Sequence, residues 1–425
     1  MNWISITFFL IAFLVFCTLF KRGADIISPA RVFGFTWSIV FGLANLKLSG
    51  LQHSWTLSDW VYALMGPSSF LLGLFAACVM AMGRQLHPVN KMRQILKNQD
   101  VNEARLFYLT IAAFTTYLVG YFIVYLVKGH VPIFAPNPGM ARTDFFIFGI
   151  GLFLHNMPFV LFFSIVYLLL VPDSRGRKWI LKAVVFITVL SYVFLLQRYQ
   201  LIMVAVIAFA LLYYATQYIR FRTVALFVAL GIAVIYSIST IRVGQLLQFA
   251  LYKGSLMKFS PEYAIITEPY MYLVMNVENF VHSVNKLDHY SFGYHTFDWV
   301  FALIQLKYPI REYFGVVETP YLFSGYNTYT LFWTFYRDFG VFGISIVPLI
   351  LGLVVGSLYY AMRRNPTIEL VSYYSIIVFV MGLSFFINLL GFLWFVYIIT
   401  WMVLILKLVR VKDSKWESGS AAHFS

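Results

Sequence analysis

Residues 341–361, VFGISIVPLILGLVVGSLYYA, form an apolar run without a charged side chain. An α-helix rises about 1.5 Å per residue, so a run of this length crosses the roughly 30 Å hydrocarbon core of a lipid bilayer. Ten further segments of the same kind lie along the chain, at 4–20, 31–48, 60–82, 106–127, 146–171, 179–196, 200–218, 223–241, 368–388 and 392–409. The sequence therefore predicts an all-α polytopic membrane protein with about eleven transmembrane helices.

The composition of the whole chain indicates that lipid is its solvent. Of the 425 residues, 61% are hydrophobic and only 11% are charged, which is more apolar surface than a soluble domain needs. The apolar segments are longer than barrel strands and do not alternate, which disfavours a β-barrel. Cys17 and Cys78 both lie within predicted spans, so the sequence predicts neither a disulfide framework nor a metal site, and no cofactor.

The net charge of +14 is distributed as a topology signal. Lys and Arg cluster in alternate short loops, at Lys21, Arg22, Arg84, Lys91, Arg93, Lys97, Arg105, Arg175, Arg177, Lys178, Lys182, Arg220, Arg222, Arg363, Arg364, Arg410, Lys412 and Lys415. The loops between them are poor in both residues, which places the basic loops in the cytoplasm. Anionic membrane lipid is a further partner for this charge, and no nucleic-acid partner is predicted.

The charge pattern and the apolar segments divide the chain into four regions. Residues 1–240 carry the first eight spans, 241–340 form one large outward-facing loop, and 341–410 carry the last spans. The polar tail 411–425 is expected to be disordered in the cytoplasm. The first apolar segment has no basic residue before it and no cleavage site, so we expect a retained helix with its N-terminus outside.

The segment 241–340 gathers most of the ionisable groups that lie outside the basic loops. It has seven basic residues and eight of the seventeen acids, namely Glu262, Glu268, Glu278, Asp288, Asp298, Glu312, Glu318 and Asp338. Polar groups collected at one membrane face indicate recognition or chemistry. We expect one or two helices over 260–284, with Glu268 and Pro269 in a first turn, and a short helix over 294–307. A third helix over 328–338, capped by Asn327, would end at Gly340 and Gly343.

Arg198 is the strongest single candidate for a site residue. It lies in LLQRYQ (195–200), between two apolar helices at the outer face, where the positive-inside rule disfavours it. A guanidinium group matches phosphate oxygens in bidentate geometry, so Arg198 is interpreted as a clamp for an anionic lipid phosphate. The alternative is an arginine that reaches lipid headgroups or pairs with a loop acid.

Three more arginines follow the same logic. Arg242 lies at the outer end of the eighth span, Arg311 precedes a glycine- and tyrosine-rich stretch, and Arg142 lies in the irregular external loop 128–145. Arg337 abuts Asp338, and a local ion pair explains it as well as a site does.

General bases are less well marked, because no nucleotide loop, HExxH, GxSxG or CxxC motif is present. The candidates for a proton acceptor are His295, His282, Glu268, Glu278 and Asp338. For each, an ordinary polar surface residue is the alternative. Asp338 stands at the membrane boundary, where it would also cap the next helix or pair with an arginine.

Aromatic residues near the end of the external segment are candidates for sugar binding. They are Tyr321, Phe323, Tyr326, Tyr329, Trp333 and Tyr336, with Tyr329, Trp333 and Tyr336 on one helix face. Their flat apolar surfaces suit the C–H groups of a sugar ring, and Asn327 beside them adds an amide. An interfacial aromatic belt is the alternative for most of them individually.

Several of these residues lie in sequence motifs that resemble those of a known protein family. The stretch SGYNTYTLFWTFYRDFGVFG (324–343) resembles the NTYT…Y.DFG..G signature of Wzy-type O-antigen polymerases, also called oligosaccharide repeat unit polymerases. The stretch DIISPARVFGFTWSIVFGLANL (25–46) resembles the early SP…F…W segment of that family. YMYLVMNVENF (270–280) and FGYHTFDW (292–299) fit its large external loop.

The resemblance implies a metal-independent, inverting glycosyltransferase of the bacterial inner membrane, with a fold similar to lipid-carrier (GT-C-like) glycosyltransferases. Such polymerases move a glycan from undecaprenyl pyrophosphate onto the terminal sugar of a second lipid-linked repeat unit at the periplasmic face. Arginines in two external loops are family hallmarks, and Arg198, Arg311 and Arg242 would match them. A separate chain-length regulator protein is the partner expected from the family.

Three other functions remain as alternatives. An O-antigen ligase shares the fold and the donor but uses lipid A-core as the acceptor. A transporter or flippase of lipid-linked oligosaccharide is less favoured, because the spans carry few charges and show no inverted repeat. A structural membrane scaffold is the third.

Overall fold

The computed structural model describes residues 3–21, 23–99, 101–171, 174–197, 199–216, 248–314 and 321–410. Regular structure within these ranges is helical, and the β-contacts there are two isolated bridges, Ser49–Met257 and Val101–Arg410. The chain divides into two compact units. The first comprises Met1–Arg93, Phe209–Pro366 and Leu370–Val396, and the second comprises Gln94–Ala208, Thr367–Glu369 and Tyr397–Ser425.

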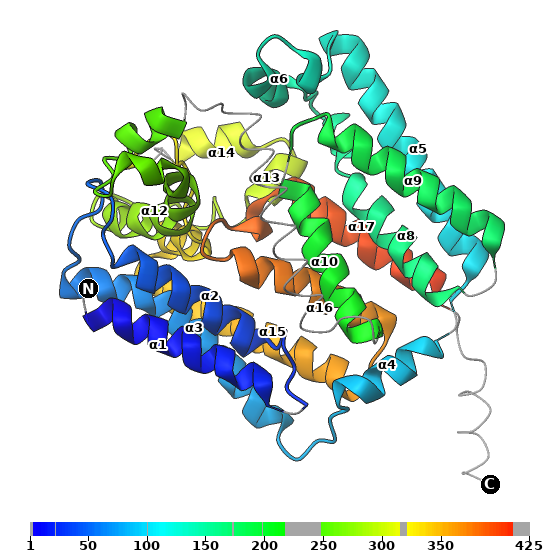
Figure 1. Ribbon diagram of the computed structural model, residues 1–425, viewed down its shortest axis with the longest axis horizontal. Helices are drawn as coiled ribbons and strands as arrows, with labels where there is room; N and C mark the ends of the chain where they lie inside the picture. The colour runs from blue at the N-terminus through cyan, green and yellow to red at the C-terminus, as the bar shows by residue number, and fades with distance from the viewer. Residues whose placement is uncertain are drawn as a thin grey trace. The chain divides into compact units, whose positions relative to one another are not determined.

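The first unit holds the long helices of the N-terminal third together with the external segment. Its helices are α1 (Trp3–Cys17), α2 (Pro29–Ala44), α3 (Leu57–Ala81), α12 (Thr267–Val284), α13 (Asp298–Leu303), α14 (Lys307–Tyr313), α15 (Leu331–Arg364) and most of α16 (Ile368–Leu383). Figure 1 shows α1, α2, α3 and α15 running side by side. Short 3₁₀ turns precede α12 and follow α16, at Pro261–Ile266 and Leu389–Gly391.

The second unit is a separate helical cluster. It contains α5 (Glu103–Lys128), α6 (Pro138–Asp144), α7 (Gly151–Leu154), α8 (Met157–Leu170), α9 (Arg175–Val193) and most of α17 (Leu393–Val409). Its core is formed by buried apolar side chains of these helices, among them Tyr117, Met157 and Tyr192. The amide of Asn156 donates to Thr116 Oγ1 at 2.6 Å, and Tyr397 Oη donates to Asn156 Oδ1 at 2.8 Å. Two further helices, α4 (Val89–Lys97) and α10 (Tyr199–Ala215), have residues in both units, as do α16 and α17.

The helices are those of an α-helical membrane protein. Five of them in the described ranges are long and apolar enough to cross a bilayer: Trp3–Phe20, Leu57–Ala81, Glu103–Phe134, Gly151–Leu170 and Leu331–Arg364. Four shorter apolar helices are Pro29–Ala44, Tyr199–Ala215, Ile368–Leu383 and Leu393–Val409. The predicted span 179–196 coincides with α9, whose first turns carry several basic residues, and 223–241 lies outside the described residues. The count of eleven spans therefore stays a prediction.

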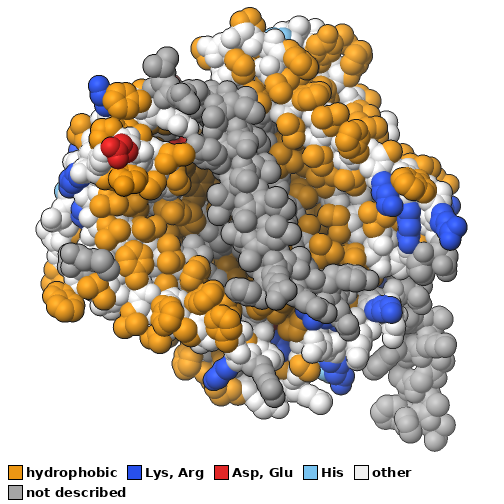
Figure 2. All heavy atoms as spheres, in the orientation of Figure 1, with side chains coloured by type: hydrophobic (Ala, Val, Ile, Leu, Met, Phe, Trp, Pro, Cys, Tyr) orange, Lys and Arg blue, Asp and Glu red, His pale blue; other side chains and the backbone are white. Residues whose placement is uncertain are grey.

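Large apolar side chains face outward on these helices. Trp3 is 81% exposed, Phe13 59% and Phe75 62%. Figure 2 shows hydrophobic side chains over much of the surface that is drawn in colour. Such exposure is unfavourable in water and expected in contact with lipid tails.

Glycines let α3 and α15 approach at backbone distance. A Cβ added at Gly73 would lie 2.1 Å from the carbonyl oxygen of Leu349, and one at Gly352 would lie 2.1 Å from that of Phe70. Gly356 follows Gly352 by four residues and meets Ala77. Small residues at this spacing are the usual means by which membrane helices pack closely, because lipid supplies no hydrophobic force between them.

The predicted turn at Gly340 is confirmed. Gly340 has φ +62° and ψ −145° inside α15, a conformation open to glycine and strained for other residues. A Cβ there would also lie 2.7 Å from the ring of Tyr290. The helix therefore bends at the boundary between its site-bearing first turns and its membrane-spanning part.

Two local predictions differ from the structure. The helix after Asn327 begins at Leu331, with Thr330 as its N-cap. Residues 326–328 stay outside the helix because Asn279 Nδ2 donates to the carbonyl oxygens of Tyr326 and Thr328. The single helix predicted over 294–307 is instead two short helices, α13 and α14, separated by a turn in which Gln305 has φ +59°. The start of α12 at Thr267, with Glu268 and Pro269 in its first turn, agrees with the prediction.

We expect Gly352→Ala to destabilise the protein, because its Cβ would overlap backbone atoms of α3. The expected loss is about 1–3 kcal/mol of unfolding free energy, measured as a lower thermal midpoint in detergent. Gly382→Ala on α16 is the matched control, since no heavy atom lies within 4 Å of its added Cβ. Equal midpoints for the two variants would contradict the close contact of α3 and α15.

Candidate functional site

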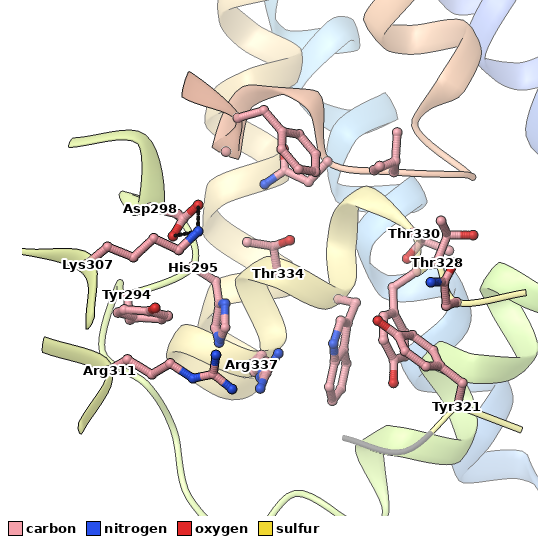
Figure 3. Close-up of a pocket in the computed structure, with 17 residues that line it drawn as sticks. Tyr294, His295, Asp298, Lys307, Arg311, Tyr321, Thr328, Thr330, Thr334 and Arg337 are labelled. Carbon is pink, nitrogen blue, oxygen red and sulfur yellow. Dashed lines mark hydrogen bonds and ion pairs between the residues drawn. The ribbon is translucent and has the colours of Figure 1, made fainter. Parts of the chain in front are cut away.

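A cavity of about 330 Å³ opens within the first unit, between the external segment and the first turns of α15. Four stretches line it: residues 294–298, 307–311, 321–337 and 387–392. Within the third stretch, the lining residues are 321, 327–330, 333, 334 and 337. Figure 3 shows their side chains converging on one space. Most of these stretches belong to the segment that the sequence predicts to face outward.

One side of the cavity carries positive charge. Lys307, Arg311 and Arg337 line it together with His295. Figure 3 shows the guanidinium groups of Arg311 and Arg337 close to the His295 ring. Lys307 Nζ is paired with the Asp298 carboxylate at 2.9 Å. The charge on this side is net positive, so it favours an anionic ligand.

His295 is held neutral at this position. Burial, and after it the positive charges of Arg337, Lys307 and Arg311, together lower its pKa from 6.5 to about 3. Its Nε2 atom is buried and has no hydrogen-bond partner among the described residues. A neutral imidazole on a residue that lines a cavity is able to accept a proton from a ligand.

Asp338 fixes the turn that carries His295. Its side chain is fully buried on α15 and accepts hydrogen bonds from Ser291 Oγ at 2.6 Å and from the backbone N–H of His295 at 3.1 Å. It also accepts from the N–H and the Oγ1 of Thr296, each at 2.6 Å. Hydrogen bonds to a buried carboxylate are short and strong, so this cluster clamps residues 291–296 against α15.

The other side of the cavity is aromatic and uncharged. The Tyr321 and Tyr329 ring centroids are 5.0 Å apart, and those of Tyr329 and Trp333 are 5.1 Å apart. Thr328 and Thr330 add hydroxyl groups, and Figure 3 shows both on the side opposite Lys307 and Arg311. This wall offers flat apolar surface with polar atoms at its edges, which suits an amphipathic ligand such as a sugar.

The structure brings six of the predicted site residues together and leaves others apart. The cavity is lined by His295, Arg311, Tyr321, Asn327, Tyr329 and Trp333. Asp338, Tyr326, Tyr336 and Glu268 do not: Asp338 holds the turn described above, and Glu268 lies in the first turn of α12. Tyr326 packs against Tyr272 and Phe323, and Tyr336 packs against Tyr62, Phe280 and Tyr290.

The remaining candidates lie elsewhere or outside the described residues. Arg198 and Arg242 are both outside the described ranges, so their placement stays a prediction. Arg142 lies in α6 of the second unit. Glu278 is fully buried and accepts from Lys47 Nζ at 2.5 Å, Gln52 Nε2 at 2.9 Å and Trp55 Nε1 at 3.0 Å. His282 does not line the cavity either.

Several cavity residues, Thr330 and Thr334 among them, are not candidates from the sequence, whereas Trp333 and Arg337 on the same helix are. Thr330, Trp333, Thr334 and Arg337 line the cavity at i, i+3, i+4 and i+7, which is one face of a helix. The helix face predicted from the sequence, with Tyr329, Trp333 and Tyr336, is displaced by one residue from the face that lines the cavity. Lys307 and Asn388 had no local signal, because only the fold brings them to Arg311 and Thr330.

Comparison with known protein families, with characterised proteins and with solved structures gives no match. In the described ranges, no group of three or more His, Cys, Asp or Glu side chains is placed to hold a metal ion. The Wzy-type resemblance of the sequence motifs therefore stays a prediction, and function has to be argued from the cavity.

Replacing Asp338 by Asn should weaken the turn that carries His295. An amide presents N–H groups to the donors of Thr296, so buried donors lose their acceptor, at a cost of about 1–3 kcal/mol. A lower thermal midpoint in detergent is the expected result. Asp288→Asn, an exposed position in the same segment, is the control and should leave the midpoint unchanged. A D338N protein as stable as D288N would mean that the clamp does not hold the turn.

The neutral state of His295 should appear as a pH dependence of stability. Its pKa is about 3 in the folded protein and near 6.5 when unfolded, so between these values only the unfolded chain binds the proton. Stability is therefore lost as the pH falls below 6.5, by about 2 kcal/mol at pH 5. The thermal midpoint of the wild type should fall more between pH 7 and 5 than that of His295→Gln. The exposed His289→Gln variant should follow the wild type, and parallel curves for all three would refute the shift.

Proposed function

We propose that this protein is a surface-polysaccharide polymerase of the O-antigen type. It would transfer a glycan from undecaprenyl pyrophosphate onto a second lipid-linked repeat unit, at the periplasmic face of the bacterial inner membrane. The observation that carries the proposal is one cavity in which a cationic side, a neutral histidine and an aromatic side meet. The motif likeness of residues 324–343, which supply most of the aromatic side, supports the same function.

The cationic side suits a departing diphosphate. Cleavage of the anomeric C–O bond leaves the electron pair on the diphosphate, whose negative charge grows in the transition state. Arg311, Arg337 and Lys307 supply fixed positive charge at the cavity wall, and guanidinium groups bind phosphate oxygens in bidentate fashion. Charge that is already in place before the reaction lowers the barrier most, because little reorganisation is needed.

His295 is the proton acceptor in this proposal. Its Nε2 would take the proton of the acceptor hydroxyl as that oxygen bonds to the anomeric carbon and the bond to the diphosphate breaks. One direct displacement of this kind inverts the anomeric carbon. The diphosphate also offsets the three cations that lower the pKa of His295, so donor binding makes the imidazole a better base when it is needed. Asp338 positions His295 and is not itself the base.

The outward orientation of the cavity rests on the distribution of charge. Its residues come mainly from 294–337, within the near-neutral segment that the positive-inside rule places outside the cytoplasm. A lipid-linked donor reaches such a cavity from the outer leaflet, with its polyprenyl chain in the bilayer beside α15.

Arg311→Ala and His295→Ala should each lower the rate of polymerisation about 100-fold or more, as expected for the loss of roughly 3 kcal/mol of transition-state stabilisation. The assay uses purified protein in liposomes with a defined undecaprenyl-pyrophosphate oligosaccharide and no ion gradient, and the product ladder is resolved by gel. Lys286→Ala, an exposed cation of the same segment outside the cavity, is the control.

The acceptor that the protein requires distinguishes a polymerase from a ligase or a transporter. Ladder formation with lipid-linked repeat unit alone supports a polymerase. Transfer that requires lipid A-core would identify a ligase, and movement of the oligosaccharide across the bilayer without any ladder would identify a transporter. Full activity of correctly inserted R311A and H295A proteins would remove the cavity from the mechanism.

A further inference from the structure

Two polar atoms on the aromatic side of the cavity are buried without a hydrogen-bond partner. They are Trp333 Nε1 and Thr330 Oγ1, on residues that are 3% and 1% exposed and that both line the cavity. A buried polar atom without a partner costs about 1–3 kcal/mol, so such atoms are rare in folded proteins. Two of them on one cavity wall indicate that a ligand supplies the missing partners.

The chemistry of these two atoms defines the ligand groups. An indole N–H only donates, and a threonine hydroxyl both donates and accepts. Together they fit ligand hydroxyl groups, which also do both. Asn388 also lines the cavity, and its Oδ1 accepts from the backbone N–H of Leu390 at 3.1 Å, which orients the amide. The polar edge of this wall therefore matches a polyhydroxylated ligand.

The charges of the cavity are confined to its other side. Every charged lining residue comes from 295–311 or is Arg337, whereas the lining residues of 321–334 and 387–392 are uncharged. Figure 3 shows Tyr321, Thr328 and Thr330 across the cavity from Lys307 and Arg311. An anionic group is drawn to the first side, which leaves the second side for a neutral ring.

The aromatic rings give that neutral ring a platform. Tyr321, Tyr329, Trp333 and Tyr336 form a row in which neighbouring rings contact one another, and Tyr321, which is 38% exposed, ends that row at the cavity. The C–H face of a sugar ring packs on such a surface. With about 330 Å³ in the whole cavity, the space admits the end of a glycan chain and not a long stretch of it.

We propose that this neutral side, formed by Tyr321, Tyr329, Thr330, Trp333 and Asn388, is a separate subsite for an uncharged terminal sugar, and that it binds this sugar whether or not the cationic side is occupied. Its identification as the acceptor subsite rests on the proposed polymerase function, whereas sugar binding does not. The sugar hydroxyl that reacts would then point across the cavity toward His295 Nε2, between the two sides.

The test is binding of a free, uncharged oligosaccharide to the purified full chain in detergent. The probe is the reducing oligosaccharide released by mild acid from the surface glycan of cells that express the chain, observed by saturation-transfer NMR. We expect binding by the wild type and about tenfold weaker binding by Trp333→Phe and Thr330→Val, each of which removes one ligand hydrogen bond and preserves shape. Trp179→Phe, an exposed residue of the second unit, is the control and should bind like the wild type.

Two further arms separate this inference from the proposed function. R311A should bind the free oligosaccharide with unchanged affinity, and inorganic pyrophosphate should not displace it, because both act on the cationic side. Displacement by pyrophosphate, or equal binding by W333F, T330V and W179F, would overturn the separate subsite. A protein that polymerises but does not bind the free oligosaccharide overturns the inference alone. A protein that binds it through Trp333 but forms no ladder supports the subsite and overturns the polymerase.

Discussion

The site depends on the carboxylate of Asp338 and the four hydrogen bonds that it accepts. They tie the turn 291–296 to α15 just before the bend at Gly340, and so they set where His295 stands relative to the cations of α14 and α15. A buried carboxylate is costly unless it is fully hydrogen-bonded, and here the donors are backbone and hydroxyl groups of a single turn. The same groups that stabilise the charge thereby set the geometry of the cavity wall.

The cavity has one positively charged side and one uncharged side within a small volume. Three cations favour an anionic ligand and add to the burial that lowers the pKa of the adjacent imidazole, while the wall across from them is uncharged and aromatic. A ligand with an anionic and a neutral polyhydroxylated part satisfies both sides at once. The charged and the uncharged side are separate because they come from different stretches of the chain, and α15 contributes residues to both.

The sequence predicted the helical membrane class and the location of the polar region well, because apolar runs and charge asymmetry are local properties. The bend at Gly340 and the start of α12 at Thr267, with Pro269 in its first turn, follow from equally local signals. The Asn327 cap failed because Asn279 of α12 binds the backbone of Tyr326 and Thr328, which no local rule describes. The sequence leaves Arg337 open between a local pair with Asp338 and a site, and in the structure Arg337 lines the cavity while Asp338 binds the turn. Lys307 and Asn388 became visible only through the fold.

At the opposite end of the first unit, Asp25 is 3% exposed and accepts hydrogen bonds from Tyr214 Oη at 2.8 Å, Tyr359 Oη at 2.9 Å and Arg363 Nη1 at 3.2 Å. These partners stand far along the chain, so they leave the ribosome long after Asp25 does. The partners that enclose the carboxylate come from α10 and α15, so its burial without them would be costly. This end of the unit is therefore complete only once α15 has been synthesised.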